Sequence, residues 1–225
     1  MAAAAQKIDW QTDILPTETL KALNWLAKQS WLKKTDWYLA GGTALALQAG
    51  HRQSVDLDFF TPQTDFSVKP LLNQLAKTLW QTTLTEPGTL YGQLFGAKVS
   101  FLANAGFKPA LPFLSYGQVQ VAQAQDIAVS KLVAISQRGR QRDFFDLYWC
   151  ANNLLPLEAM MPRLKKQYPL AEFNYHHLLK SLVYFADAEN EPAPKIFFSA
   201  SWPEVKNFFK KETDRLAAKF LNLKP

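Results

Sequence analysis

The sequence is poor in the side chains that build disulfides and many metal centres. Its 225 residues include one cysteine, Cys150, and three histidines. A single cysteine cannot form an intrachain disulfide, and its apolar and aromatic neighbours predict a small buried side chain. His176 and His177 are adjacent, so on a helix they point in different directions, and no nearby cysteine or carboxylate completes a ligand set. A surface or packing role is predicted for this pair.

Long hydrophobic runs are also missing. No stretch of about 18 apolar residues occurs, so no membrane span and no membrane partner are expected. The first residues, Met1 to Lys7, are small and lack the apolar region of a secretory signal, which makes a cytoplasmic protein the expectation. The 25 basic residues exceed the 19 acidic ones, and the formal charge of +6 favours polyanionic partners without requiring them.

Several signatures of well-known catalytic classes are absent. The double glycine Gly41-Gly42 is not followed by Lys-Ser or Lys-Thr at the spacing of a Walker loop, and no third glycine follows in the register of a dinucleotide site. No nucleophile elbow occurs, and no Ser-His-Asp or Cys-His set can be assembled. These absences argue against P-loop enzymes, dinucleotide-dependent enzymes and triad hydrolases.

The sequence does contain a dense motif between Leu39 and Phe60, LAGGTALALQAGHRQSVDLDFF. Gly41 and Gly42 follow an apolar strand and open a short helix. Free backbone N–H groups and the positive helix end would therefore point at a bound anion. The hydroxyl of Thr43 can donate to a phosphate oxygen. A double glycine alone is usually only a turn, so its meaning depends on the residues that come after it in the motif.

Asp56 and Asp58 close this motif. In a strand, residues i and i+2 point to the same face, so both carboxylates project together while Val55, Leu57 and Phe59 face a core. Two carboxylates this close repel each other unless a cation lies between them, and Mg²⁺ takes one or two carboxylates plus substrate phosphates. The pair is predicted to bind Mg²⁺, with Mn²⁺ as an alternative ion. The plainer alternative is a solvated edge strand with alternating charge.

A second motif, DIAVSKLVAISQRGRQRDFFDLY, places basic side chains around carboxylates. Lys131 and Arg138 are seven residues apart, so on one helix they share a face that could meet a triphosphate. Further basic residues follow at Arg140, Arg142 and Lys165. Lys131 is therefore predicted to be functional.

The two carboxylates of this second motif are harder to assign. Asp143 and Asp146 are three residues apart and share a helix face. Asp143 either serves the site or pairs with Arg138 or Arg142 near a helix N-terminus, where acidic residues are favoured. Both alternatives stay open for Asp143, whereas Asp146 is predicted to be structural.

Hydrophobic periodicity predicts an α+β protein in which a mixed sheet is followed by helices. Two domains are predicted, 1–122 and 123–225, with no internal repeats. Helices are expected at 17–34, 43–48, 69–79, 157–167, 174–189 and 201–222, and over most of 126–152 with a break at 138–140. Strands are expected at 37–40, 55–60, 82–84, 89–95, 98–103 and 119–122.

Together the two motifs resemble the AbiEii/AbiGii-toxin-type nucleotidyltransferases of the DNA polymerase beta superfamily. The blocks and the segment between them span residues 37–150. The resemblance implies a minimal nucleotidyltransferase palm with a helical C-terminal domain and an NTP as substrate. It also implies roles for five site residues: Thr43 contacting phosphate, Asp56 and Asp58 holding Mg²⁺, Lys131 binding nucleotide phosphates, and Asp143 at the cleft.

One position departs from the superfamily pattern, in which many enzymes carry a third carboxylate on a neighbouring strand. Ser100 occupies the matching position here, and a serine cannot act as a base at neutral pH unaided. The expected activity is transfer of a nucleoside monophosphate from an NTP to an acceptor hydroxyl, on an RNA or tRNA 3′ end or on a protein. A toxin with a cognate antitoxin is also expected. The alternative is a catalytically weak or inactive nucleotide- or RNA-binding module.

Overall fold

The computed structural model describes residues 8–221, and a mixed seven-stranded sheet forms its centre. The strand order is β3-β4-β5-β2-β1-β7-β6. The strands are β1 (Tyr38–Ala40), β2 (Leu57–Thr61), β3 (Gln81–Glu86), β4 (Thr89–Leu94), β5 (Ala97–Ala103), β6 (Leu114–Tyr116) and β7 (Val119–Val121). β2 is antiparallel to β1 and parallel to β5, so the two central pairs differ in direction. The predicted α+β class is confirmed.

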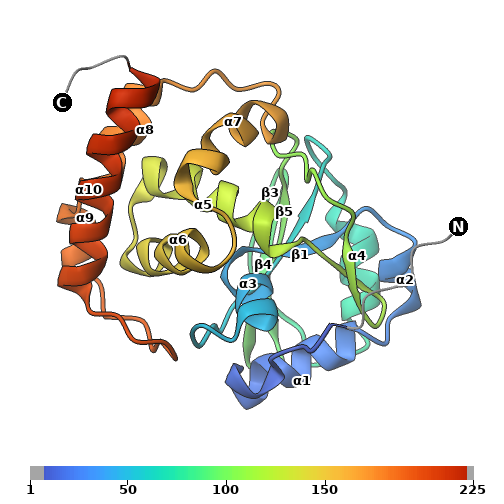
Figure 1. Ribbon diagram of the computed structural model, residues 1–225. Coiled ribbons are helices and arrows are strands. Elements are labelled where there is room, and N and C mark those ends of the chain that lie inside the picture. Colours follow the sequence, from blue (N-terminus) through green and yellow to red (C-terminus); the bar gives the residue numbers. More distant parts are fainter. Residues whose placement is uncertain (1–7, 222–225) are drawn as a thin grey trace, which may run out of the picture.

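The helices cover the sheet and then continue beyond it (Figure 1). Before and between the strands lie a 3₁₀ turn (Thr12–Ile14), α1 (Thr17–Leu26), α2 (Ser30–Lys33), α3 (Gly41–Ala49) and α4 (Val68–Leu75). After the last strand come α5 (Ala124–Arg138), α6 (Gln141–Asn153), α7 (Leu157–Gln167), α8 (Tyr175–Leu182), α9 (Ala186–Glu189) and α10 (Trp202–Phe220). The strands therefore all precede residue 122, as predicted, while the division into two domains stays a prediction.

The central strands alternate between a core face and a polar face. Leu57 and Phe59 of β2 are fully buried, and Phe59 stacks on Phe101 of the adjacent strand with ring centroids 5.2 Å apart. Asp58 lies between them in sequence and projects from the other face, as period-two alternation requires. The prediction for Val55 was wrong. This residue precedes β2 and is 47% exposed, because the strand begins only at Leu57.

Several predicted element boundaries need correction. The predicted helix 17–34 is two helices, because the carbonyl of Ala27 accepts the backbone N–H of Gln118 at 2.8 Å and the turn at Gly117 packs against it. The segment 174–189 is likewise two helices, and strand β6 was not predicted. The break at 138–140 is confirmed: Gly139 adopts a left-handed conformation, φ 49°, between α5 and α6. Residue 222 of the last predicted helix, and Met1–Lys7, lie outside the described residues.

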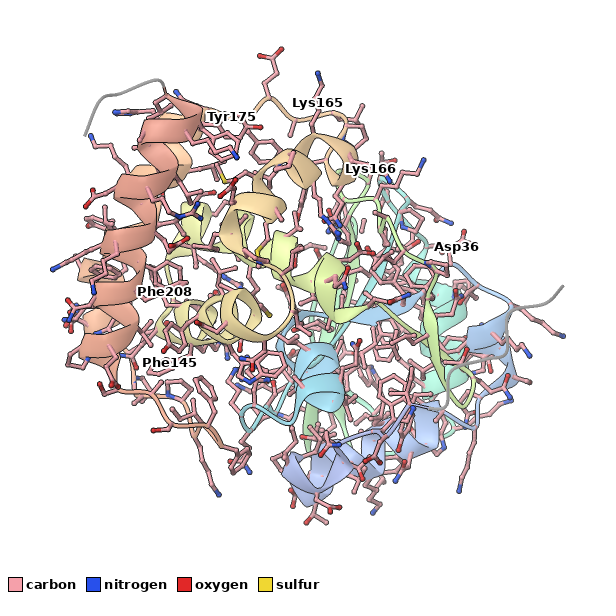
Figure 2. The ribbon with its side chains drawn as sticks, in the orientation of Figure 1. Asp36, Phe145, Lys165, Lys166, Tyr175 and Phe208 are labelled. Carbon is pink, nitrogen blue, oxygen red and sulfur yellow. The ribbon has the colours of Figure 1, made fainter. Side chains whose placement is uncertain are left out.

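The later helices are held by aromatic side chains. Phe144 of α6 lies 5.3 Å from Phe209 of α10 between ring centroids, and Tyr148 contacts Phe208 in the same way. Figure 2 shows Phe145 and Phe208 on the left of the view, where α6 and α10 lie. The buried position of Cys150 confirms its prediction. Among residues 8–221, no helix is both long enough and apolar enough to span a bilayer.

Candidate active site

The carboxylates lie in a row of side chains that crosses the polar face of the sheet. Asp58 on β2 pairs in register with Ser100 on β5, and Ser100 pairs with Tyr91 on β4. The Ser100 hydroxyl donates a hydrogen bond of 2.5 Å to Oδ1 of Asp58. Ser100 therefore lies beside Asp58 on the neighbouring strand, which is where a third carboxylate is expected from the superfamily pattern. It holds Asp58 in place.

Asp56 immediately precedes β2 and has an unsatisfied oxygen. Its Oδ1 is buried and has no hydrogen-bond partner among the described residues. Its Oδ2 lies 3.7 Å from Nη1 of Arg142, at a half-exposed position. Burial raises the pKa of Asp58, and the neighbouring Asp56 charge adds to this, while the Ser100 hydrogen bond opposes it. The two carboxylates therefore lack favourable partners: one buried oxygen of Asp56 accepts no hydrogen bond from the described residues, and the charged form of Asp58 is disfavoured.

A divalent cation fits these two side chains. It would supply the missing partner of the buried Asp56 oxygen and offset the burial of the Asp58 charge. Within residues 8–221, no group of three or more His, Cys, Asp and Glu side chains could hold a metal. Two carboxylates alone suit Mg²⁺, which keeps its remaining positions for water and substrate phosphates. Asp56 and Asp58 are thus the residues that would hold the ion.

The two glycines each make room for a different charged side chain. Gly41 has φ 71°, and a Cβ there would lie 3.2 Å from Oδ2 of Asp58. A Cβ on Gly42 would lie only 2.4 Å from Nη2 of Arg52. Real Cβ atoms essentially never come that close to another heavy atom. The first helical turn of α3 therefore approaches the Asp58 carboxylate and the buried guanidinium of Arg52 at once.

The position of the Thr43 hydroxyl differs from the one that its expected contact with a phosphate would require. Its side chain is buried, and its hydroxyl is hydrogen-bonded to the backbone carbonyl of Asp56 and lies 2.8 Å from the Ser54 hydroxyl. The hydroxyl thus ties α3 to the segment that carries the aspartates. Phosphate contact by the Thr43 side chain stays a prediction that this arrangement does not favour.

Behind the cleft lies a buried network of charges. Nζ of Lys131 lies 2.6 Å from Oδ1 of Asp143 and 2.6 Å from Oδ2 of Asp146. Asp146 also accepts from Nε of Arg52 at 2.5 Å and from Nη2 at 2.9 Å, and its Oδ1 lies 2.7 Å from Nε2 of His51. All five side chains are buried. The network joins the segment after α3 to α5 and α6.

The charges in this network stabilise one another. Burial alone would raise the pKa of Asp146, but Arg52 and Lys131 hold it well below the usual range. Burial alone would lower the pKa of Lys131, and Asp146 and Asp143 raise it instead. The pKa of Asp143 is lowered against its burial by Lys131 and Arg138. Lys131 is consequently a fixed positive charge at any ordinary pH.

A cleft of about 480 Å³ runs between the sheet and α5. Gly41, Gly42, Asp56, Asp58 and Lys131 all line it, so the structure brings most of the predicted site together. Five cationic side chains line this cleft: Arg52, Lys131, Arg138, Arg140 and Arg142. Aromatic side chains line it as well: Tyr38, Phe60, Tyr91, Phe107 and Tyr168. The cleft thus offers both positive charge and flat apolar surface to a ligand.

Some predicted residues lie outside this cleft. Asp143 is fully buried and forms ion pairs with Lys131 and Arg138, so its placement favours a positioning role, and its catalytic assignment stays a prediction. Lys165 is exposed on α7 at the upper edge of the view in Figure 2. The ring of His177 lies 3.3 Å from the backbone carbonyl of Ser136, in keeping with the predicted packing role.

Sequence reasoning missed the aromatic lining and the Arg142–Asp56 contact. Tyr168 and Phe107 come from segments with no recognisable motif, and only the fold brings them to the cleft. Arg142 could have been suspected, because it adjoins Asp143 in the second motif. The stacking of Tyr38 on Phe113, 4.9 Å apart between ring centroids, depends equally on the tertiary fold.

Comparison with known protein families identifies the chain as a nucleotidyltransferase. The matching family model is described as nucleotidyl transferase AbiEii toxin, type IV toxin–antitoxin system, and it covers residues 32–88 and 102–220. Because that match spans more than half of the chain, the protein belongs to the AbiEii nucleotidyltransferase toxin family and is a transferase. A curated relative from Aquifex aeolicus, itself uncharacterised, is 37% identical over 191 residues, or 79% of this chain and 86% of the relative.

Solved structures agree with the fold. The nucleotidyltransferase toxin MenT4 of Mycobacterium tuberculosis H37Rv superposes with a TM-score of 0.52 at 16% identity, over 90% of this chain and 89% of that one. A Helicobacter pylori protein provisionally described as a nucleotidyltransferase gives a TM-score of 0.51 at 17% identity, covering 91% and 98% of the two chains. At such low identity these similarities bear on the fold alone.

Proposed function

We propose that this protein is the toxin of a toxin–antitoxin pair and transfers a nucleoside monophosphate from an NTP to an acceptor hydroxyl. The observation that carries the proposal is the unsatisfied carboxylate pair, Asp56 and Asp58, beside a cleft lined by five cations. Transfer from a nucleoside triphosphate requires a site for a divalent cation next to a basic surface that binds the phosphates.

Each part of the cleft has a task in this proposal. Lys131 and Arg138, with the backbone of Gly41 and Gly42, hold the β- and γ-phosphates by position and charge. The aromatic side chains accept the nucleobase. Mg²⁺ held by Asp56 and Asp58 would neutralise phosphate charge and lower the pKa of the attacking hydroxyl. The acceptor is an RNA 3′ end, tRNA included, or a protein hydroxyl, and a cognate antitoxin is the expected partner.

One observation favours a slow enzyme or a binding module as the second candidate. Ser100 takes the position of a third carboxylate and donates to Asp58, while Asp143 is buried with a lowered pKa. Neither side chain can take a proton from the acceptor at neutral pH. The base is then the substrate itself or solvent, and turnover is limited accordingly.

The test is incubation of the purified protein with each α-³²P-labelled NTP, Mg²⁺, and either total tRNA or a protein pool. We expect Mg²⁺-dependent label transfer that is abolished in the double variant Asp56→Ala with Asp58→Ala. Unchanged transfer by the double variant would rule out the proposed site. NTP binding seen by calorimetry without transfer to any pool would favour the binding module.

A further inference from the structure

The linker between α9 and α10, residues 190–201, contacts two segments that carry cations of the cleft. In the view of Figure 1 it runs below α6 towards the loop that follows α3. Two sets of contacts are separate in the linker sequence: Glu191 makes one set at its beginning, and residues 195–197 make the other near its end. The linker therefore touches the site from outside the cleft.

The later contacts are made by the backbone. The carbonyl of Lys195 accepts the backbone N–H of Gln53 at 2.9 Å, and the carbonyl of His51 accepts the backbone N–H of Phe197 at 2.8 Å. Arg52 lies between these two bonded residues and forms an antiparallel bridge with the linker. The segment that carries Arg52 is therefore fixed to the linker as well as to the buried charge network.

The earlier contacts are made by the side chain of Glu191. Its Oε2 accepts the backbone N–H of Gln141, the first residue of α6, at 3.1 Å. Its Oε1 lies 3.7 Å from Nε of Arg140. The Glu191–Arg140 ion pair is long and partly exposed, so it contributes little by itself. The hydrogen bond to the helix terminus is the shorter of the two contacts.

This hydrogen bond matters because α6 begins with a residue that does not cap it. The N-cap position is occupied by Arg140, whose side chain makes no capping hydrogen bond with the described residues and lines the cleft. The first N–H groups of a helix have no partner within the helix, and a side-chain oxygen often satisfies one of them. A carboxylate also suits the positive end of a helix. Glu191, 50 residues later in the sequence, supplies the oxygen that an arginine cannot.

The start of α6 carries several side chains of the site. Arg142 lies 3.7 Å from Asp56, and Asp143 lies 2.6 Å from Nζ of Lys131. Arg140, immediately before the helix, and Arg142 both line the cleft. A shift in the first turn of α6 would therefore move two of the five cations that line the cleft.

We infer that Glu191 is a positioning residue for NTP binding: by capping α6 it holds Arg140 and Arg142 where they can contact the triphosphate. The inference rests on the proposed function, in which the cations of the cleft bind the phosphates. The negative charge of Glu191 by itself would weaken the binding of an anion. Its favourable contribution therefore depends on the placement of the two arginines, and substitutions can separate the effect of placement from the effect of charge.

The experiment compares the wild type with Glu191→Ala and Glu191→Gln, using Glu189→Ala as the control. Glu189 is a nearby carboxylate whose side chain contacts Trp202 and Lys206 of α10. Calorimetry with Mg²⁺ gives the Kd of each NTP, label transfer gives KM and kcat, and thermal unfolding gives the stability. The Kd remains measurable even where transfer is slow.

Glu191→Ala should raise the Kd and KM for the NTP about tenfold with kcat nearly unchanged, because misplaced phosphate-binding side chains lose binding energy equally in the ground state and the transition state. Glu191→Gln keeps a carbonyl oxygen for the Gln141 N–H, so its Kd and KM should stay within about twofold of the wild type. Glu189→Ala should keep the NTP constants of the wild type. The unfolding midpoint should fall in Glu191→Ala, because a helix loses its cap.

Several results would overturn the inference alone. An unchanged NTP Kd in Glu191→Ala would show that the cap supports only the fold. Tighter NTP binding in both Glu191 variants would show that the charge matters and the placement does not. Equal weakening in Glu191→Gln and Glu191→Ala, or in Glu189→Ala, would contradict the role of the cap. Failure of the proposed function shows differently, as absence of NTP binding by the wild type, and that result would overturn this inference with it.

Discussion

Two pairs of aspartates lie near the same cleft, and their surroundings have opposite characters. Asp143 and Asp146 are fully buried, yet their oxygens contact Lys131, Arg52, Arg138 and His51. Asp56 and Asp58 are nearer to solvent, yet one buried oxygen has no hydrogen-bond partner among the described residues, and the pKa of Asp58 is raised. The buried, ion-paired aspartates stabilise the fold, whereas Asp56 and Asp58 are the pair that we propose binds an added cation.

The contrast teaches that the carboxylate alone does not define a metal site. In each pair the two aspartates are close in sequence: Asp143 and Asp146 lie on α6, and Asp56 and Asp58 lie just before and within β2. The difference lies in the number of basic side chains nearby. The buried pair contacts four of them, namely His51, Arg52, Lys131 and Arg138, whereas Asp56 has one ion pair among the described residues, with Arg142 at 3.7 Å. Substitutions in the two pairs and in their neighbours can test this difference, and the largest effect on stability is expected in the buried pair.

Asp146→Ala should be the most damaging of the substitutions considered. It removes the carboxylate that both Arg52 and Lys131 contact and leaves two buried cations short of a partner. Loss of one partner from a buried ion pair costs about 3–5 kcal/mol. Denaturant unfolding measures the effect, with the exposed Asp187→Ala as control. An unchanged unfolding midpoint would mean that the network does not support the fold.

Gly42→Ala should lower the stability less than Asp146→Ala does. It acts on the same network through Arg52. The new methyl group would come within 2.4 Å of Arg52 Nη2, so the guanidinium must shift away from Asp146. Overpacking of this kind costs about 1–3 kcal/mol. Thermal unfolding measures it against Gly106→Ala, where a Cβ meets nothing closer than 3.9 Å. Equal stability of the two variants would contradict the assigned role of Gly42.

Asp58→Asn should stabilise the folded protein, unlike the two substitutions above, because it removes an unfavourable charge. In the presence of EDTA we expect the free energy of unfolding at neutral pH to rise, since burial disfavours the charged form of Asp58 and the asparagine carries no charge. Added Mg²⁺ should stabilise the wild type and leave the variant unaffected. Scanning calorimetry in both buffers provides the measurement. A destabilised variant in EDTA would show that the Asp58 charge is already satisfied by the protein.

Arg142→Ala should have the smallest effect on stability, below about 0.5 kcal/mol, because its ion pair with Asp56 is half-exposed and long. Its effect should appear in the KM for the NTP, which should rise while the unfolding midpoint stays constant. Steady-state label transfer at varied NTP concentration gives this result. An unchanged KM would remove Arg142 from the phosphate-binding wall.

Much of this arrangement can be predicted from the sequence, because it depends on residues that are close together in the chain. Strand periodicity predicts Asp56 and Asp58 on one face, and both line the cleft, although β2 begins only at Leu57. The helix break at Gly139 follows from the Arg-Gly-Arg sequence. The pairing of Lys131 with both Asp143 and Asp146 depends on how α5 packs against α6. That packing depends on contacts between segments that are distant in the sequence, so the spacing of residues does not reveal it. The same holds for Arg52, which would lie 2.4 Å from a Cβ at Gly42.

Tyr91 illustrates the same limit in the sheet. No motif near Tyr91 in the sequence marks it as a residue of the cleft, and the residues around it predict only a strand. Its position two strands from Asp58 depends on strand order, since β5 pairs with both β2 and β4. Strand order is set by long-range packing, so the place of Tyr91 at the cleft could be recognised only after the fold was known.

The most direct test of Asp56 and Asp58 as a metal site is Mn²⁺ binding followed by electron paramagnetic resonance. The wild type and the double variant Asp56→Asn with Asp58→Asn are titrated with Mn²⁺, and Asp187→Asn serves as control. We expect the wild type and the control to reduce the signal of free Mn²⁺, and the double variant to leave it unchanged. Equal Mn²⁺ binding by the double variant and the wild type would contradict the assignment of this aspartate pair as the metal site.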